Sequence, residues 1–260
     1  MIDTKLLTQL RNVTGAGIAD CKEALEEADN DIDQAVAILR KRGAIKANKK
    51  SDRDTNEGVI AQSLADHKVA TVALASETDF AARDEEFIKT VNEFSKELLE
   101  STVDDFKKSA EAKIKDELTV KIGENLVLRV AEIVEGEVIG TYIHSNKKVA
   151  AVIALSSGSQ ELANDLAMQI TAMSPRYIKP EDIPADEIDK EKDIYREQLK
   201  SEGKPAEMWE KIIPGKLSKF YQEVCLLNQT FIKDDKKKVQ DIINESGDNI
   251  EVVKFSRYQI

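Results

Sequence analysis

The sequence predicts an α+β protein in which a small helical bundle is followed by two copies of a unit made of a β-hairpin and helices. Three observations support this class. The first 46 residues carry only helical apolar patterns, and two similar segments in the middle of the chain each predict a hairpin followed by a helix. A pair of long, charged amphipathic helices then interrupts the second copy.

Composition narrows the function classes. The chain has 260 residues, enough for one large domain or two to three small ones. Its net charge of −11 argues against broad binding to nucleic acids or anionic membranes, because neutralising phosphates requires a basic face. No apolar run approaches the roughly 20 residues of a membrane span, and the first ten residues lack a signal-peptide layout. Two cysteines, Cys21 and Cys225, fit a reducing compartment, so a cytoplasmic location is expected.

Residues 1–46 are expected to form a three-helix domain. Each helix presents one apolar face, made by Leu6, Leu7 and Leu10, then Cys21, Leu25 and Ala28, then Ile32, Val36 and Leu39. Glycines punctuate the first turn, and Gly43 is expected to end the third helix as its C′ residue. Residues 47–56 contain almost nothing apolar and are predicted to be a linker.

An internal repeat lies in the middle of the chain. Residues 57–76 and 136–156 align with one extra residue in the second turn, and each predicts a hairpin that leads into an amphipathic helix. The copies define two core subdomains, 57–135 and 136–179 with 226–260. They differ where the helix begins, and we expect the functional difference to lie there.

The remaining segments complete the architecture. Residues 111–132 predict a helix followed by a strand, and residues 180–225 predict an antiparallel helical hairpin that turns at Gly203-Lys204-Pro205. One face of its first helix carries Ile188, Tyr195 and Leu199, and one face of its second carries Trp209, Ile213, Phe220 and Val224. Residues 250–260 alternate and predict a closing strand.

The most informative segment is Thr78-Asp79-Phe80-Ala81, at the junction of a strand and a helix that begins there. Thr78 is expected to be the N-cap, and Asp79 suits the positive end of the helix dipole. Phe80 lies outside the apolar stripe that starts at Phe87, because Arg83 and Asp84 occupy the intervening turn. It either caps the core or is an exposed wedge into another molecule. The local pattern alone favours the first interpretation.

Catalytic chemistry has little support in the sequence. His67 and His144 fall in expected hairpin turns, and Cys21 is expected to be a core residue. No P-loop, HExxH, paired CxxC or GxSxG motif occurs. We therefore expect a binding protein that is not an enzyme, with no catalytic residues, no metal and no cofactor.

Nine motifs, taken together and in order, carry a resemblance. They are Thr14-Gly15-Ala16-Gly17, Asp20-Cys21-Lys22, Ala24-Leu25, Glu77-Thr78-Asp79-Phe80, Lys121-Ile122-Gly123-Glu124-Asn125, Tyr142-Ile143-His144, Ala167-Met168, Gly203-Lys204-Pro205 and Arg257-Tyr258. From about residue 4 to its last residue the chain resembles bacterial elongation factor Ts. The resemblance implies that residues 1–46 form a bundle like the ubiquitin-associated (UBA) domain and that residues 180–225 form a protruding coiled coil.

The resemblance also implies a function in translation. Members bind elongation factor Tu, in its GDP and nucleotide-free forms, and promote exchange of guanine nucleotide without touching nucleic acid or membrane. The implied wedge, which disturbs the Mg²⁺ and phosphate site of the partner, comprises Thr78, Asp79, Phe80 and Ala81. The implied partner contacts are Arg11, Gly15, Gly17, Ile18, Ala19, Gly123 and Gln169.

The chain departs from the family in several places. Ile18 and Ala19 stand where two methionines are usual, and Gln169 replaces a histidine. Pro214-Gly215 is expected to kink or restart the second helix of the helical hairpin. Many members continue into a C-terminal helix beyond the position of Ile260, which implies a greater dependence on the N-terminal unit.

Two alternatives remain open. One is a UBA-type interaction scaffold without exchange activity, in which residues 1–46 alone retain most of the binding. The other is an enzyme of unrecognised type.

Overall fold

The computed structural model describes residues 4–50 and 53–260, with the backbone alone for residues 43–50. The chain divides into two compact units. The first extends to Ile133 and adds Ser145–Val149 and Tyr258–Ile260, and the second contains Val134–His144 and Ala150–Arg257. Within the described ranges, no helix is both long and apolar enough to cross a bilayer.

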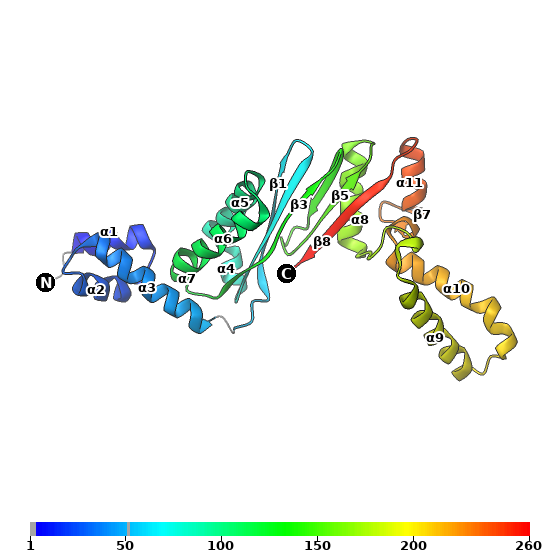
Figure 1. The fold of residues 1–260 in the computed structure, drawn as a ribbon, viewed down its shortest axis with the longest axis horizontal. Helices are drawn as coiled ribbons and strands as arrows, with labels where there is room; N and C mark the ends of the chain where they lie inside the picture. Colours follow the sequence, from blue (N-terminus) through cyan, green and yellow to red (C-terminus); the bar gives the residue numbers. More distant parts are fainter. Residues whose placement is uncertain (1–3, 51–52) are drawn as a thin grey trace. The chain divides into compact units, whose positions relative to one another are not determined.

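The first unit begins with three helices, α1 (Thr4–Thr14), α2 (Ile18–Glu27) and α3 (Ile32–Lys50), which are labelled in Figure 1. The three predicted apolar faces meet in one small core, whose buried members include Leu10, Cys21, Ala24, Leu25, Ala35 and Leu39. Gly15, with a φ of 65°, makes the turn that brings α2 back against α1. The predicted helical bundle is confirmed.

The third helix is longer than predicted. α3 continues through Gly43 to Lys50, so the expected C′ role of Gly43 is wrong, and residues 47–50 of the expected linker are helical. A glycine inside a helix costs only about 1 kcal/mol, and the alanine and lysine residues that follow it are good helix formers. Residues 51 and 52 of that expected linker lie outside the described residues.

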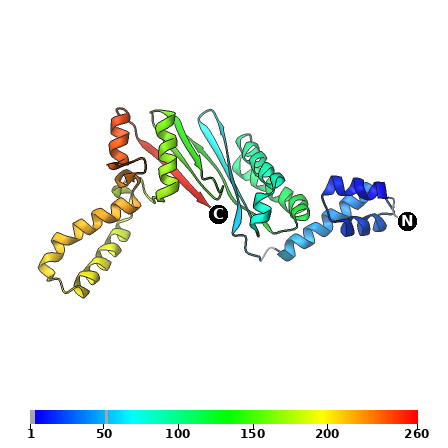
Figure 2. The ribbon, with the colours of Figure 1, turned by 180° about the vertical axis from the view of Figure 1, so that it is seen from behind.

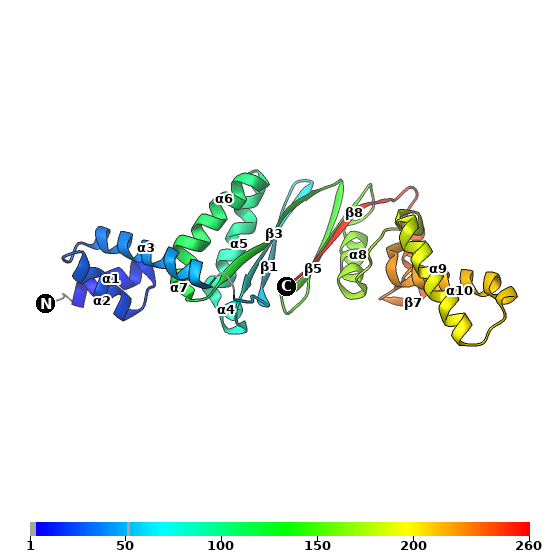
Figure 3. The same ribbon diagram turned by 60° about the horizontal axis from the view of Figure 1, so that its bottom comes forward.

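The first copy of the repeat forms a hairpin of β1 (Glu57–Ala65) and β2 (Lys68–Ser76), paired antiparallel from Glu57–Ser76 to Ala65–Lys68. β3 (Leu126–Glu135) completes the sheet in the order β1-β2-β3. α5 (Glu85–Leu99) packs on β1 and β2, and α6 (Val103–Lys113) lies beside α5 (Figure 3). Phe94 and Phe106 join these helices edge to face, with ring centroids 5.8 Å apart. A short π-helix (Ile114–Leu118) and α7 (Thr119–Ile122) then lead to β3.

The second copy repeats this plan. β4 (Val138–Ile143) and β5 (Val149–Leu155) form an antiparallel hairpin, and β8 (Val252–Gln259) joins it in the order β4-β5-β8. α8 (Gln160–Met173) covers one face of this hairpin, as the yellow-green helix in Figure 2 shows. Its apolar side, including Leu166 and Ile170, belongs to the same buried cluster as Ile153 of β5. The predicted repeat of a hairpin followed by a helix and the predicted closing strand are both confirmed.

The predicted helical hairpin is also confirmed. It begins with a 3₁₀ turn (Pro180–Asp182) and consists of α9 (Ala185–Ser201) and α10 (Ala206–Val224). The two predicted apolar faces meet, with Leu199, Ile213 and Phe220 buried between the helices. α10 runs unbroken through Pro214, so the expected restart there is wrong. Proline lacks one backbone donor, but its fixed φ is compatible with a helix held by packing on both sides of it.

A short region between the helical hairpin and β8 was not predicted element by element. It contains a 3₁₀ turn (Leu226–Asn228), a small hairpin of β6 (Thr230–Phe231) and β7 (Asp234–Lys238), and α11 (Val239–Ser246). The strand β7 consists entirely of Asp and Lys, so it carries no alternating apolar signal.

Candidate partner-binding site

The wedge segment, Thr78–Ala81, starts a helix of its own. α4 (Asp79–Arg83) has only five residues, and the Thr78 hydroxyl caps it by accepting a hydrogen bond from the Ala81 amide at 3.3 Å. The predicted N-cap is therefore confirmed. The helix was expected to continue into the Phe87 stripe, and this is wrong, because Asp84 adopts an extended backbone with ψ of 131°.

Asp84 ends α4 and begins α5. Its Oδ1 accepts hydrogen bonds from the amides of Glu86 and Phe87, at 3.0 and 2.9 Å, and so acts as the N-cap of the second helix. An aspartate side chain can accept hydrogen bonds from nearby backbone amides in place of the helical carbonyls. A helix can therefore end and a new one begin at such a residue, even where the sequence pattern predicts one continuous helix. α4 and α5 are consequently two separate helices that meet at Asp84.

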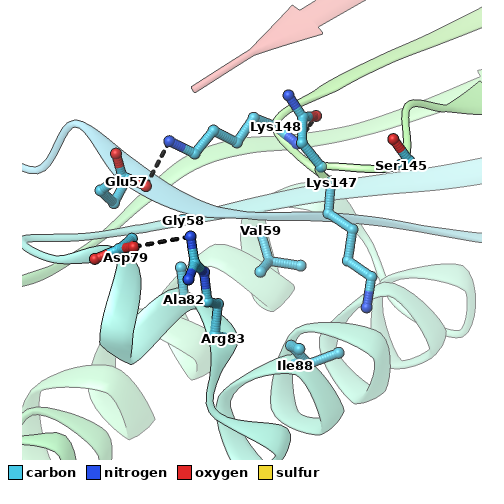
Figure 4. Close-up of a pocket in the computed structure, with 11 residues that line it drawn as sticks. Glu57, Gly58, Val59, Asp79, Ala82, Arg83, Ile88, Ser145, Lys147 and Lys148 are labelled. Atoms are coloured by element: carbon cyan, nitrogen blue, oxygen red, sulfur yellow. Dashed lines mark hydrogen bonds and ion pairs between the residues drawn. The ribbon is translucent and has the colours of Figure 1, made fainter.

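Phe80 points away from the core. Its side chain is 82% exposed, whereas that of Phe87 is 1% exposed. The interpretation that Phe80 caps the core is therefore wrong. Asp79 beside it is half-exposed and forms an ion pair with Arg83 at 3.0 Å (Figure 4). Ala81 lies on the buried side of α4, so it presents little surface of its own.

Two carboxylates join the wedge segment to the turn after α7. Glu124 accepts hydrogen bonds from the amide and the hydroxyl of Thr78, at 3.0 and 2.5 Å. Glu77 accepts one from the amide of Asn125 at 2.6 Å. Neither role is predicted by the sequence patterns, although each residue lies inside a motif of the resemblance. The presence of one glutamate in each of these two motifs was the only available hint that the motifs interact.

A hollow of about 540 Å³ opens beside Asp79 (Figure 4). The ion pairs Asp79–Arg83 and Glu57–Lys148 lie on its wall, with Ile88 as an apolar patch. A wall that carries both positive and negative side chains around an apolar one suits a side chain or loop of another protein, whose charged groups of either sign can find a partner there.

The predicted N-terminal contacts lie around the turn between α1 and α2. Arg11, Gly15, Gly17, Ile18 and Ala19 are all exposed there. Ile18 is 55% exposed, so its side chain lies at the surface of this turn.

The two other predicted partner contacts, Gly123 and Gln169, differ in their exposure to solvent. Gly123 is exposed, with a left-handed φ of 81° and open space around it. Gln169 is fully buried, so its prediction as a partner contact is not supported. Its amide nitrogen donates to Gln229 Oε1 and the Thr230 carbonyl, both at 3.1 Å, and its oxygen accepts from the Ile232 amide at 2.8 Å. A polar side chain on a buried helix face joins α8 to the β6 strand here.

Gln169→Leu should therefore lower stability and leave partner binding unchanged. The substitution keeps the volume but leaves the buried partners of Gln169 without a hydrogen bond, which should cost about 2–4 kcal/mol of unfolding free energy. Urea denaturation measures this cost, with Gln222→Leu on the exposed face of α10 as the control. Weaker partner binding by a fully stable Gln169→Leu would restore Gln169 to the interface.

Cys21 lies in the core and both histidines lie in exposed turns, as predicted. Cys21 and Cys225 are buried, and burial raises the pKa of both thiols, that of Cys225 to about 11. A thiol with a raised pKa is a poor nucleophile. His67 lies in the β1–β2 turn and His144 follows β4, both exposed. In the part of the chain that the structure describes, no three His, Cys, Asp or Glu side chains could hold a metal ion together.

Comparisons with known proteins match both parts of the fold. Residues 1–43 match the model of the family described as UBA-like domain, and residues 77–260 match that of Elongation factor TS. The chain belongs to the elongation factor Ts family. This membership confirms the resemblance and identifies a translation elongation factor.

Individual relatives extend the match over nearly the full chain. The chain is 42% identical over 264 residues to elongation factor Ts of Hydrogenobaculum sp., covering 96% of each chain. It is 40% identical to the elongation factor Ts proteins of Marinobacter nauticus and Aquifex aeolicus, covering 100% and 97% of this chain and 91% and 95% of theirs. The architecture described above is thus that of an elongation factor Ts protein.

Proposed function

We propose that this protein is a guanine-nucleotide exchange factor that binds elongation factor Tu carrying GDP and promotes GDP release. Family membership supports the partner. The observation that carries the mechanism is the 82% exposure of Phe80 at the tip of a separately capped helix. The protein performs no covalent chemistry in this role, because exchange requires only a change in binding free energy.

Phe80 is suited to act as an anchor. Burying a phenylalanine side chain yields about 2–3 kcal/mol, and aromatic anchors of this size often dominate an interface. The helix start that carries it is already fixed by the Thr78 cap, so binding orders few additional degrees of freedom.

Asp79 can contribute with little cost. Its ion pair with Arg83 is largely exposed to solvent, and exposed pairs of this kind contribute at most about 1 kcal/mol. The carboxylate can therefore leave Arg83 for a cation or amide of the partner. Together, Asp79 and Phe80 would insert beside the nucleotide-binding domain of elongation factor Tu.

The release of GDP follows from linkage. Nucleotide-binding proteins hold the phosphates with a loop, a helix N-terminus and an octahedral Mg²⁺, all of which require accurate geometry. A wedge that shifts the supporting elements weakens these contacts without touching the nucleotide. The factor and GDP then weaken each other's binding by the same free energy.

Release of fluorescent GDP from elongation factor Tu tests this proposal. With unlabelled GDP in excess, the release rate should rise with the concentration of this protein and reach a plateau. A complex that forms without any change in release rate would instead support the UBA-type scaffold.

Removal of Mg²⁺ tests the proposed route. A chelator should itself speed GDP release, and the further acceleration by this protein should shrink, because both act on the same metal contact. The measurement is the ratio of release rates with and without the protein, at millimolar Mg²⁺ and in excess chelator. An unchanged ratio would indicate a route through the base or a phosphate contact instead.

A further inference from the structure

The start of the wedge helix and the turn after α7 hold each other through two acidic side chains, which we call the Glu77–Glu124 clamp. Glu124 binds both the amide and the hydroxyl of Thr78, at 3.0 and 2.5 Å. Glu77, one residue before Thr78, binds the amide of Asn125, one residue after Glu124, at 2.6 Å. The clamp thus joins segments 46 residues apart in sequence.

Glu124 acts on the wedge through Thr78. The Thr78 hydroxyl donates to Glu124 and, in the same position, accepts the hydrogen bond from the Ala81 amide that caps α4. The orientation of the cap is therefore set by the carboxylate. Hydrogen bonds to a charged acceptor are among the stronger ones in proteins, so this orientation is held firmly.

The segment before β1 adds a third support. Arg53 forms an ion pair with Glu77 at 3.2 Å, and the carbonyl of Arg53 accepts a hydrogen bond from the Asn125 side chain at 2.9 Å. Asn125 is buried. The clamp is consequently attached to the segment before β1 and to one buried side chain, that of Asn125.

α4 needs such support because it cannot hold itself. Five residues are too few for a stable isolated helix. Only Ala81 and Ala82 are buried, and they contribute small contacts. In the second copy, by contrast, Ser159 caps α8 and the helix inserts Leu162 and Leu166 directly into the core.

We propose that Glu124 is a positioning residue for nucleotide exchange. By fixing the Thr78 cap it sets the direction in which α4 presents Phe80, and it need not touch the partner. This inference rests on the proposed exchange function. Its signature is a lower maximal rate of GDP release at a nearly unchanged half-saturating concentration, because the other contacts still form the complex.

Glu124→Ala tests the proposal in the fluorescent-GDP assay with the full chain. We expect the maximal release rate to fall about tenfold, as the loss of a charge-assisted hydrogen bond predicts. The half-saturating concentration should change by less than about threefold. A misplaced wedge loses contacts that form only in the transition state of GDP release, and the contacts that hold the complex together remain. Glu124→Gln can still accept from the amide and donate to the hydroxyl, so it should recover much of the rate.

Two controls separate positioning from general damage. Glu86→Ala removes a neighbouring carboxylate that pairs with Lys121, without affecting Thr78, and should change neither parameter beyond about twofold. Hydrogen exchange at the Thr78 amide in the isolated protein should accelerate about tenfold or more in Glu124→Ala and not in Glu86→Ala. This second measurement does not depend on the partner.

The outcomes are distinct. A Glu124→Ala protein with a full maximal rate, or with a raised half-saturating concentration alone, would overturn the positioning role. An unchanged rate of hydrogen exchange at the Thr78 amide in Glu124→Ala would also overturn the positioning role, whatever the thermal stability of the variant. If the unaltered protein failed to accelerate GDP release, the proposed function would fail, whereas the amide measurement would still report whether Glu124 holds the wedge.

Discussion

Phe80→Ala is expected to lower the maximal rate of catalysed GDP release about 30-fold while leaving the isolated protein as stable as before. Loss of an aromatic anchor worth about 2 kcal/mol corresponds to this factor. Stability should not change, because the side chain is 82% exposed and adds nothing to the core. The measurements are the fluorescent-GDP release rate and urea denaturation of the free protein.

The matched control is Leu64→Ala. Leu64 is also a large apolar residue of the first unit, 55% exposed near the end of β1. It should keep normal exchange, which would show that exposed apolar area alone does not explain the effect. If Phe80→Ala instead lost the roughly 3–5 kcal/mol typical of a deleted core aromatic, Phe80 would belong to the core.

Gly140→Ala is expected to produce the largest loss of stability. A Cβ at Gly140 of β4 would overlap the main-chain carbonyl of Ala163 in α8. Neither group can rotate away, because one belongs to a paired strand and the other to a buried helix. Overpacking usually costs about 1–3 kcal/mol, and a clash between two backbones should reach or exceed the upper figure. Urea denaturation of the full chain measures it.

Gly215→Ala provides the opposite result. Gly215 lies inside α10, and no atom lies within 4 Å of the position that an alanine methyl group would take there, so alanine should fit freely. It should raise stability by about 0.5–1 kcal/mol, since alanine favours helix over glycine. Equal stability of the two variants would mean that β4 and α8 approach less closely than described.

Periodic apolar patterns predicted most of the fold. The stripe from Phe87 to Leu98 and the apolar run of β2 are buried as expected, and the opposing faces of α9 and α10 are buried fully or in part. Such patterns report which face of an element meets a core, and so they succeed where one face does. They fail for β7, whose residues are all charged, and at Gly43, where a weak helix former lies between strong ones.

The site was only partly predictable for a different reason. Thr78 could be recognised as a cap from its neighbours, because capping is local. The exposure of Phe80 depends on the break at Asp84, and aspartate is compatible with both a helix and a cap. Glu124 acts across 46 residues of sequence, and Gln169 is buried through partners on other elements. Only the folded chain brings these groups together.

The break at Asp84 also makes the wedge helix a separable part. Because Asp84 supplies the N-cap of α5 itself, the register of the core stripe is fixed from that residue onward and does not depend on what precedes it. Inserting one residue between Phe80 and Arg83 would leave Phe87 in place on one side and, on the other, leave Phe80 held through Thr78 by the Glu77–Glu124 clamp. The two ends of α4 are therefore fixed independently of each other, and Ala82 is the residue through which a change of its length would reach the core.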